Sequence, residues 1–124
     1  MGNRACVIFF DSNHVSPTVY LHWHGYAVPT WLNRLKTLMD GRFHDAAYAT
    51  ARFIGICHME IESNLSLGVS HNRFRIQDLT DEKAMAEASP GDAGVIVVDT
   101  SNFTWKAYGG YLAESNHNIT IKGE

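Results

Sequence analysis

Two histidines separated by a single tryptophan are the residues whose type and spacing most directly suggest chemistry. Residues 18–25 read Thr-Val-Tyr-Leu-His-Trp-His-Gly. In a β-strand successive side chains alternate between faces, so His22 and His24 would share one face with Tyr20, and Trp23 would lie on the other. Two such imidazoles can converge on one metal ion such as zinc, or act side by side as proton carriers. The alternative is that both are ordinary side chains on the solvent-facing side of a sheet.

A metal-dependent hydrolase or nuclease built on His22 and His24 would need a further ligand. The chain has seven histidines, but no further ligand stands at a persuasive spacing from the pair. The residues that could supply one are Asp11, His14, His58 and His71. Glu60 and Glu62 could hold a divalent ion only if they lie on an extended segment. We therefore expect no cofactor, with a zinc site at His22 and His24 as the alternative.

No complete motif for nucleophilic catalysis is present. Cys57 and His58 are adjacent, and adjacent residues on a helix point about 100° apart, so they do not form a catalytic pair. A Gly-x-Ser-x-Gly elbow and a phosphate-binding glycine-rich loop are both missing from the sequence. Cys6 and Cys57 each lie in an apolar run and are expected to be buried and reduced. These observations favour a protein that is not an enzyme.

Charged and aromatic residues supply the candidates for partner binding. Arg73 and Arg75 flank Phe74, a pattern that could stack a base or clamp a phosphate in a nucleic-acid-binding module. The following acidic stretch could dock on a basic partner, or could be a solvated helix face. Exposed Trp and Tyr side chains can anchor protein interfaces. The predicted partner-binding residues are Arg73, Arg75, Asp78, Asp81, Glu82, Glu87, Trp105, Tyr108 and Tyr111.

Composition limits the class of protein. The 124 residues fit one domain, and 45% hydrophobic with 19% charged residues is ordinary for a folded chain. A net charge of −3 argues against broad non-specific binding to nucleic acid. No apolar run approaches the ~20 residues of a membrane helix. The apolar run at the N-terminus is short for a signal peptide, so we expect a cytoplasmic protein.

The pattern of apolar residues predicts a single α+β domain over residues 1–124. We expect an antiparallel sheet of four to six strands with two main helices packed on one face. One helix begins at Pro29 and ends before Gly41, and the other is capped by Asp45. A short acidic helix is expected over residues 80–88, capped by Thr80. The candidate strands, of which the sheet would use four to six, span residues 5–10, 18–25, 65–70, 73–77, 95–99, 103–108 and 118–122.

Four short motifs resemble a set of short, uncharacterised proteins carried by phages, plasmids and other bacterial mobile elements. They are Gly2-Asn3-Arg4-Ala5, Tyr20-Leu21-His22-Trp23-His24-Gly25, Ala51-Arg52-Phe53-Ile54-Gly55 and Gly109-Gly110-Tyr111. The resemblance runs over most of the chain and implies no catalytic residue. It implies a context, because small accessory proteins of mobile elements often inhibit host defence machinery, including CRISPR effectors.

The sequence therefore predicts a small non-enzymatic binding protein that occupies a surface of a larger partner. The expected partner is a host protein or a protein–nucleic acid complex, and the resemblance implies an anti-CRISPR-like inhibitor. The metal-dependent hydrolase and the nucleic-acid-binding module stay as alternatives.

Overall fold

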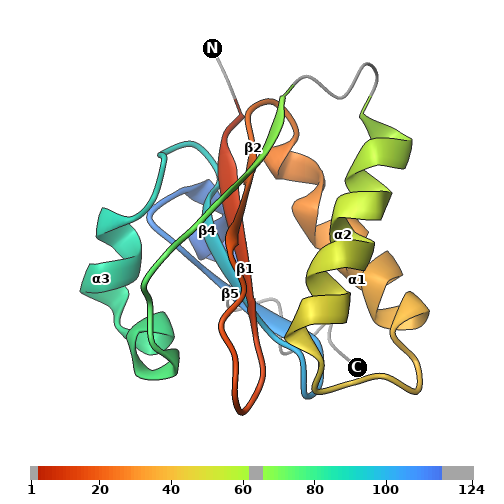
Figure 1. The fold of residues 1–124 in the computed structure, drawn as a ribbon. Coiled ribbons are helices and arrows are strands. Elements are labelled where there is room, and N and C mark those ends of the chain that lie inside the picture. The colour runs from red at the N-terminus through yellow and green to blue at the C-terminus, as the bar shows by residue number, and fades with distance from the viewer. Residues whose placement is uncertain (1–2, 62–65, 116–124) are drawn as a thin grey trace.

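A five-stranded mixed sheet forms the centre of the molecule, in a computed structural model that describes residues 3–61 and 66–115 (Figure 1). The strand order is β3-β2-β1-β4-β5. The strands are β1 (Ala5–Phe10), β2 (Thr18–Leu21), β3 (Leu67–Ser70), β4 (Gly94–Asp99) and β5 (Thr104–Tyr108). The predicted single α+β domain with two main helices on one face is confirmed.

The sheet is mixed, whereas the sequence suggested a purely antiparallel one. The central strands β1 and β4 run parallel, and every other pair of neighbours is antiparallel. A parallel pair needs a long crossover, and the chain between β1 and β4 provides it with three α-helices and two further strands. Both central strands are buried on both faces, which explains why their sequences are almost uniformly apolar.

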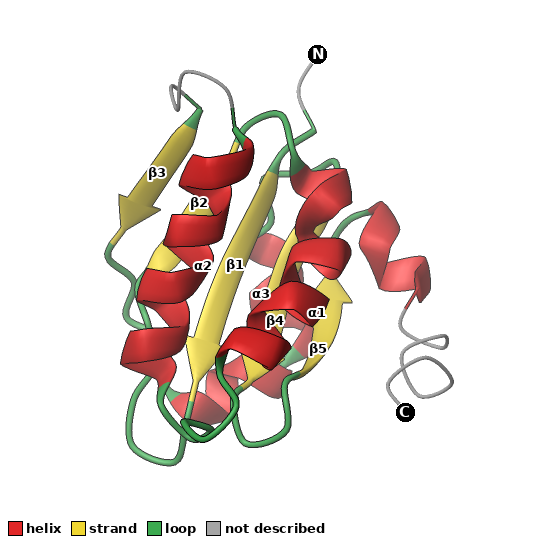
Figure 2. Cartoon of the chain, turned by 90° about the vertical axis from the view of Figure 1, so that its right-hand side faces the viewer, coloured by secondary structure: helices red, strands yellow, loops and turns green. Residues whose placement is uncertain are grey.

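The two long helices, α1 (Val28–Leu38) and α2 (Ala46–Glu60), cover one face of the sheet (Figure 2). Pro29 lies in the first turn of α1, as predicted. Asp45 caps α2 by accepting a hydrogen bond from the backbone N–H of Tyr48, also as predicted. Phe53 of α2 packs on Phe9 of β1, with 5.5 Å between ring centroids. This face holds the larger part of the core.

The opposite face carries a smaller core under the 3₁₀ helix η3 (Ile76–Thr80) and the short helix α3 (Glu82–Glu87). Leu79 and Met85 are fully buried there against Ile8, Val95 and Tyr108. In Figure 1, α3 lies on the side of the sheet away from α1 and α2. The covered strands are β1, β4 and β5, so this face is left more open at β2 and β3.

Three local predictions need correction or lie outside the described residues. The strand expected over residues 73–77 is absent, because Ile76 begins η3 and Phe74 packs on the smaller core. The acidic helix is capped by Asp81 instead of Thr80, through hydrogen bonds from two backbone N–H groups. The strand predicted over residues 118–122 lies outside the described residues. None of the helices described is long and apolar enough to cross a membrane.

Candidate functional site

Asn3 organises one end of the sheet, where β1 begins and β2 ends. Its backbone N–H donates to the carbonyl of His22 at 2.7 Å, and its own carbonyl accepts from Gly25 N–H at 2.8 Å. Its side-chain oxygen accepts from the Tyr111 hydroxyl at 2.6 Å. One residue thereby fastens the segment after β2 and the segment after β5 to the start of β1.

This arrangement ends β2 at Leu21, earlier than the sequence suggested. The chain passes from the sheet into the short 3₁₀ helix η1 (Gly25–Ala27), and the backbone of Gly25 lies against Asn3. A Cβ atom on Gly25 would lie 2.6 Å from the Asn3 carbonyl oxygen and 2.7 Å from Ala93 Cβ. Only glycine permits this approach. The prediction that His22 and His24 share the face of one strand is therefore wrong.

The two histidines have different surroundings. A hydrogen bond of 2.8 Å joins His22 Nδ1 to the Tyr20 hydroxyl, and the His22 ring meets Trp23 edge to face with 4.3 Å between centroids. The His24 ring instead stacks on Trp31 at 6.0 Å and lies 6.1 Å from Tyr26. Nδ1 of His24 is buried and has no hydrogen-bond partner in the part of the chain that the structure describes.

The predicted metal ligands do not gather into one group. Within residues 3–61 and 66–115, no set of three His, Cys, Asp or Glu side chains is placed to hold an ion. Asp11, considered as a further ligand, follows the far end of β1, where it accepts hydrogen bonds from three backbone N–H groups. Cys57 is buried and Cys6 half-buried. Desolvation raises the pKa of Cys57 to about 12 and that of Cys6 to about 11, so neither is an activated nucleophile.

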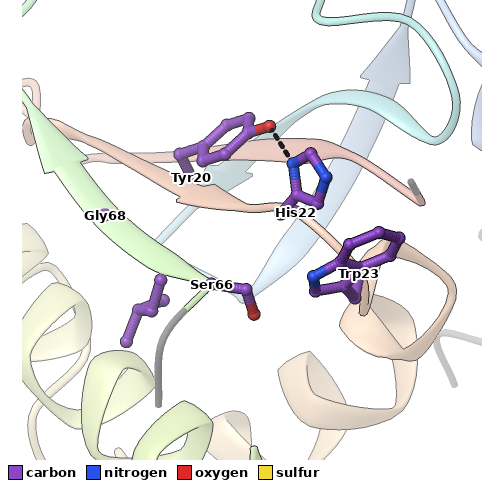
Figure 3. Close-up of a pocket in the computed structure, with 6 residues that line it drawn as sticks. Tyr20, His22, Trp23, Ser66 and Gly68 are labelled. Atoms are coloured by element: carbon purple, nitrogen blue, oxygen red, sulfur yellow. Dashed lines mark hydrogen bonds between the residues drawn. The ribbon is translucent and has the colours of Figure 1, made fainter. Parts of the chain in front are cut away.

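A hollow of about 280 Å³ opens beside the Tyr20–His22 pair, at the corner of the sheet formed by β2 and β3 (Figure 3). The residues that line it are Tyr20, His22, Trp23, Ser66, Leu67 and Gly68. Gly68 faces Tyr20 across the two strands, and the space where its side chain would be is empty. The Tyr20 and His22 rings lie together on one side of the strands, and Trp23 lies beyond the end of β2.

An ion pair lies close to this hollow. Arg4 donates to Asp92 from its backbone N–H at 2.9 Å and from its guanidinium Nε at 3.0 Å. These hydrogen bonds hold the pKa of the Asp92 carboxyl below its ordinary value. The backbone of Asp92 also accepts from Tyr111 N–H. The pair thus ties the loop before β4 to the same end of the sheet.

Three large aromatic side chains of this end remain exposed. Trp23 is 47% exposed, Tyr26 61% and Tyr111 43%. Each ring makes a defined contact: Trp23 with His22, Tyr26 with His24, and Tyr111 with Asn3. We call these three residues the aromatic end. Trp23 was expected on the face of the strand opposite His22 and His24, and this expectation is wrong because the strand ends at Leu21.

The other predicted aromatic residues lie elsewhere. Trp105 and Tyr108 are on opposite faces of β5. Trp105 is half-buried against the larger core, and Tyr108 is only 5% exposed in the smaller core. Of the three aromatic residues predicted from the C-terminal third, Tyr111 alone belongs to the aromatic end.

Two of the four predicted acidic residues stabilise their own segment. Asp78 accepts a hydrogen bond from Arg75 N–H at 2.8 Å, which lowers the pKa of its carboxyl. Asp81 caps α3 through the N–H groups of Lys83 and Ala84. Glu82 lies 3.8 Å from Lys106 of β5. Glu87 ends α3 with an exposed side chain.

The two predicted basic residues, Arg73 and Arg75, differ in their contacts within the fold. Arg75 lies 3.5 Å from the Asp78 carboxylate, and Phe74 is half-buried against the smaller core. Arg73 is exposed. Because Phe74 packs inward, it does not present a free ring on which a base could stack, so the structure lends this motif no support as a nucleic-acid contact.

Sequence reasoning missed Asn3, Tyr26 and Asp92 as parts of this end of the molecule. Asn3 acts mainly through its backbone, and Asp92 is close only because the chain returns to the start of β1 at a residue 88 positions after Arg4. Gly25 was the available signal, because a glycine within an expected strand such as residues 18–25 often marks a close backbone approach. Comparison with family models, curated proteins and solved structures finds no match for this chain.

Proposed function

We propose that this protein is a non-enzymatic binding protein that docks on a larger protein through its aromatic end. The observation that carries the proposal is the combination of exposure and fixed position in Trp23. Its ring is 47% exposed, yet it is held edge to face against His22 in a segment fastened through Asn3. A large ring held in place before binding loses little side-chain entropy on binding, which suits it to anchor an interface.

Tyr26 and Tyr111 extend the same surface, and both carry a hydroxyl that can bond to a partner at the edge of an interface. The resemblance to short proteins of mobile elements adds a class of partner, a bacterial defence complex. The acidic stretch contributes less than the sequence suggested, since Asp78 and Asp81 are engaged in hydrogen bonds within their own segment.

The test is affinity capture from a bacterial lysate, with the captured proteins quantified by mass spectrometry. The Trp23→Ala/Tyr26→Ala double variant removes two exposed rings and leaves the Tyr111–Asn3 hydrogen bond in place. Tyr48→Ala is the matched control, because Tyr48 is 48% exposed and lies at the start of α2, near the opposite end of the sheet.

We expect the double variant to lose at least about tenfold of the captured partner, because an anchor residue of an interface typically contributes about 2 kcal/mol or more. The Tyr48→Ala protein should capture as much as wild type. Equal capture by all three proteins, with unchanged circular dichroism, would remove the aromatic end from the binding surface.

A further inference from the structure

The strand β3 is an edge of the sheet among residues 3–61 and 66–115. Within those residues β2 is its one neighbouring strand, and the four residues of β3 are half-buried or exposed. Natural edge strands are commonly protected by a lysine, a proline or a covering segment. The other edge strand, β5, carries Lys106 on its exposed side, whereas β3 reads Leu-Gly-Val-Ser.

The hydrogen-bonding pattern shows which backbone groups of β3 face outward. His22 N–H donates to the Ser66 carbonyl at 3.0 Å, and Tyr20 lies opposite Gly68 in the same antiparallel register. Bonded and non-bonded positions alternate along an antiparallel pair, so the backbone groups of Leu67 and Val69 point away from β2. These two N–H and two C=O groups have no hydrogen-bond partner among the residues that the structure describes.

The side chains along this edge suit an added strand. Val69 is 55% exposed, although the residue opposite it on β2, Val19, is fully buried. The hollow described above opens at the same edge, where Gly68 leaves space beside Tyr20. An added strand presents side chains alternately to the two faces of a sheet, so one would lie against Val69 and a neighbour could enter the hollow.

We propose that β3 accepts an extended segment of the partner protein as a sixth strand, with one apolar side chain of that segment in the hollow. The inference rests on the proposed binding function and names the form of the partner's contact. The outward N–H and C=O groups of Leu67 and Val69 are matched by an extended backbone, whereas a helix has already used its own backbone groups.

A second copy of this chain fits the edge less well. Two β3 strands paired about a twofold axis at Gly68 would place glycine opposite glycine, and no side chain would fill either hollow. Each copy would offer only two outward-facing residues, far from the ~800 Å² per partner of a stable interface between folded proteins. A peptide needs less area and can supply the missing side chain.

The probe for the test is a phage-displayed library of random nonapeptides, selected on the full-length protein. The most enriched peptide is synthesised and titrated into the protein, and amide hydrogen exchange is followed by NMR. We expect an alternating apolar sequence, and slowed exchange at the amides of Leu67 and Val69 on binding.

Two variants separate the backbone edge from the hollow. Val69→Pro removes an outward N–H and leaves the ladder to β2 intact, so peptide affinity should fall at least tenfold. Its control, Val69→Thr, keeps the N–H and should stay within threefold of wild type. Gly68→Leu fills the hollow and should also weaken the peptide at least tenfold, whereas Gly55→Leu adds the same side chain in open space on α2 and should not.

If Val69→Pro does not fold, the added strand is tested by amide exchange in the wild-type complex and by the peptide titration of Gly68→Leu. The inference is overturned if no peptide is enriched, or if the peptide protects amides elsewhere. It is also overturned if Leu67 and Val69 become protected without peptide as protein concentration rises, which would identify a second copy as the occupant. One further outcome separates the two proposals. If Trp23→Ala/Tyr26→Ala loses the partner captured from lysate and Val69→Pro captures as much as wild type, the proposed function is retained and the added strand is rejected.

Discussion

A Gly25→Ala substitution tests the close approach that directs the chain out of β2 and sets the aromatic end in place. The added Cβ would lie 2.6 Å from a backbone oxygen of Asn3 and 2.7 Å from Ala93 Cβ, well inside the 3.4 Å at which ordinary contact begins. Both neighbours are fixed: the Asn3 backbone is bonded to His22 and Gly25, and Ala93 N–H is bonded to the Arg4 carbonyl. The strain therefore has no flexible side chain to absorb it.

Overpacking of this kind destabilises a protein by about 1–3 kcal/mol. The free energy of unfolding of a small protein falls by about 2 kcal/mol per molar urea, so a variant that loses about 2 kcal/mol of this free energy unfolds at a urea concentration about 1 M lower. Gly55→Ala is the matched control: Gly55 is exposed in the middle of α2, and a Cβ there meets nothing within 4 Å. Alanine favours the helix over glycine by about 0.5–1 kcal/mol, so the control should raise the midpoint.

The measurement is urea unfolding of the three proteins followed by circular dichroism. We expect the same glycine-to-alanine change to lower the unfolding midpoint at position 25 and to raise it at position 55. The reasoning about Gly25 is refuted if Gly25→Ala unfolds at the wild-type midpoint, or if Gly55→Ala lowers the midpoint as much as Gly25→Ala. Folded Gly25→Ala protein, measured without urea, should also capture less partner, because displacement of Asn3 moves both Trp23 and Tyr111.

Asp11→Ala should lose about 2–4 kcal/mol of unfolding free energy in urea titrations at pH 7, since three backbone N–H groups lose their acceptor. Burial opposes ionisation of Asp11, but these bonds outweigh it and lower its pKa below 3.8. The ionised Asp11 carboxylate therefore stabilises the folded protein above its unfolded-state pKa, and this stabilisation is lost as pH falls through its folded-state pKa. An Asp11→Asn protein should lack that acid-dependent loss of stability. Cys6 and Cys57 should react with an aromatic disulfide at pH 8 about a hundredfold more slowly in the native than in the urea-unfolded protein. The reason is that burial raises the pKa of Cys6 to about 11 and that of Cys57 to about 12. Equal reaction rates in the two states would contradict the burial of these thiols. Asp81→Lys should lower the melting temperature by removing the α3 cap, whereas Glu87→Lys should leave it unchanged; equal melting temperatures in the two variants would argue against the cap.

Sequence patterns were informative at the two long helices, where one local cause determines each N-terminus. Asp45 caps α2 and Pro29 lies in the first turn of α1, because both effects act within one helical turn. Strands β1 and β4 were recognisable from apolar runs. Their parallel pairing was not, because it depends on the course of the chain between them and leaves no local signature.

The candidate site was harder to predict because its contacts join distant parts of the chain. The alternating pattern of residues 18–25 continued past Leu21 in sequence, but a backbone contact between Gly25 and Asn3 ended the strand. Trp23 was therefore assigned to the wrong environment. The acidic stretch misled in another way, since a capping carboxylate such as Asp81 looks the same in sequence as one that binds a partner.

The two ends of the sheet use their polar groups differently, and that difference is the basis for placing the proposed binding surface at one of them. At the far end of β1, the buried carboxylate of Asp11 is surrounded by three backbone N–H groups, one of them at the start of α2, so its hydrogen-bonding capacity serves the fold. At the near end, Asn3 uses its backbone and side chain to fasten segments that carry Trp23 and Tyr111 outward. Folding alone gives no reason to fix large apolar rings where water still reaches them, since exposed aromatic surface contributes little to stability. In the part of the chain that the structure describes, these fixed and exposed rings lie at the same end as a hollow and a strand edge, and for that reason we propose this end as the binding surface.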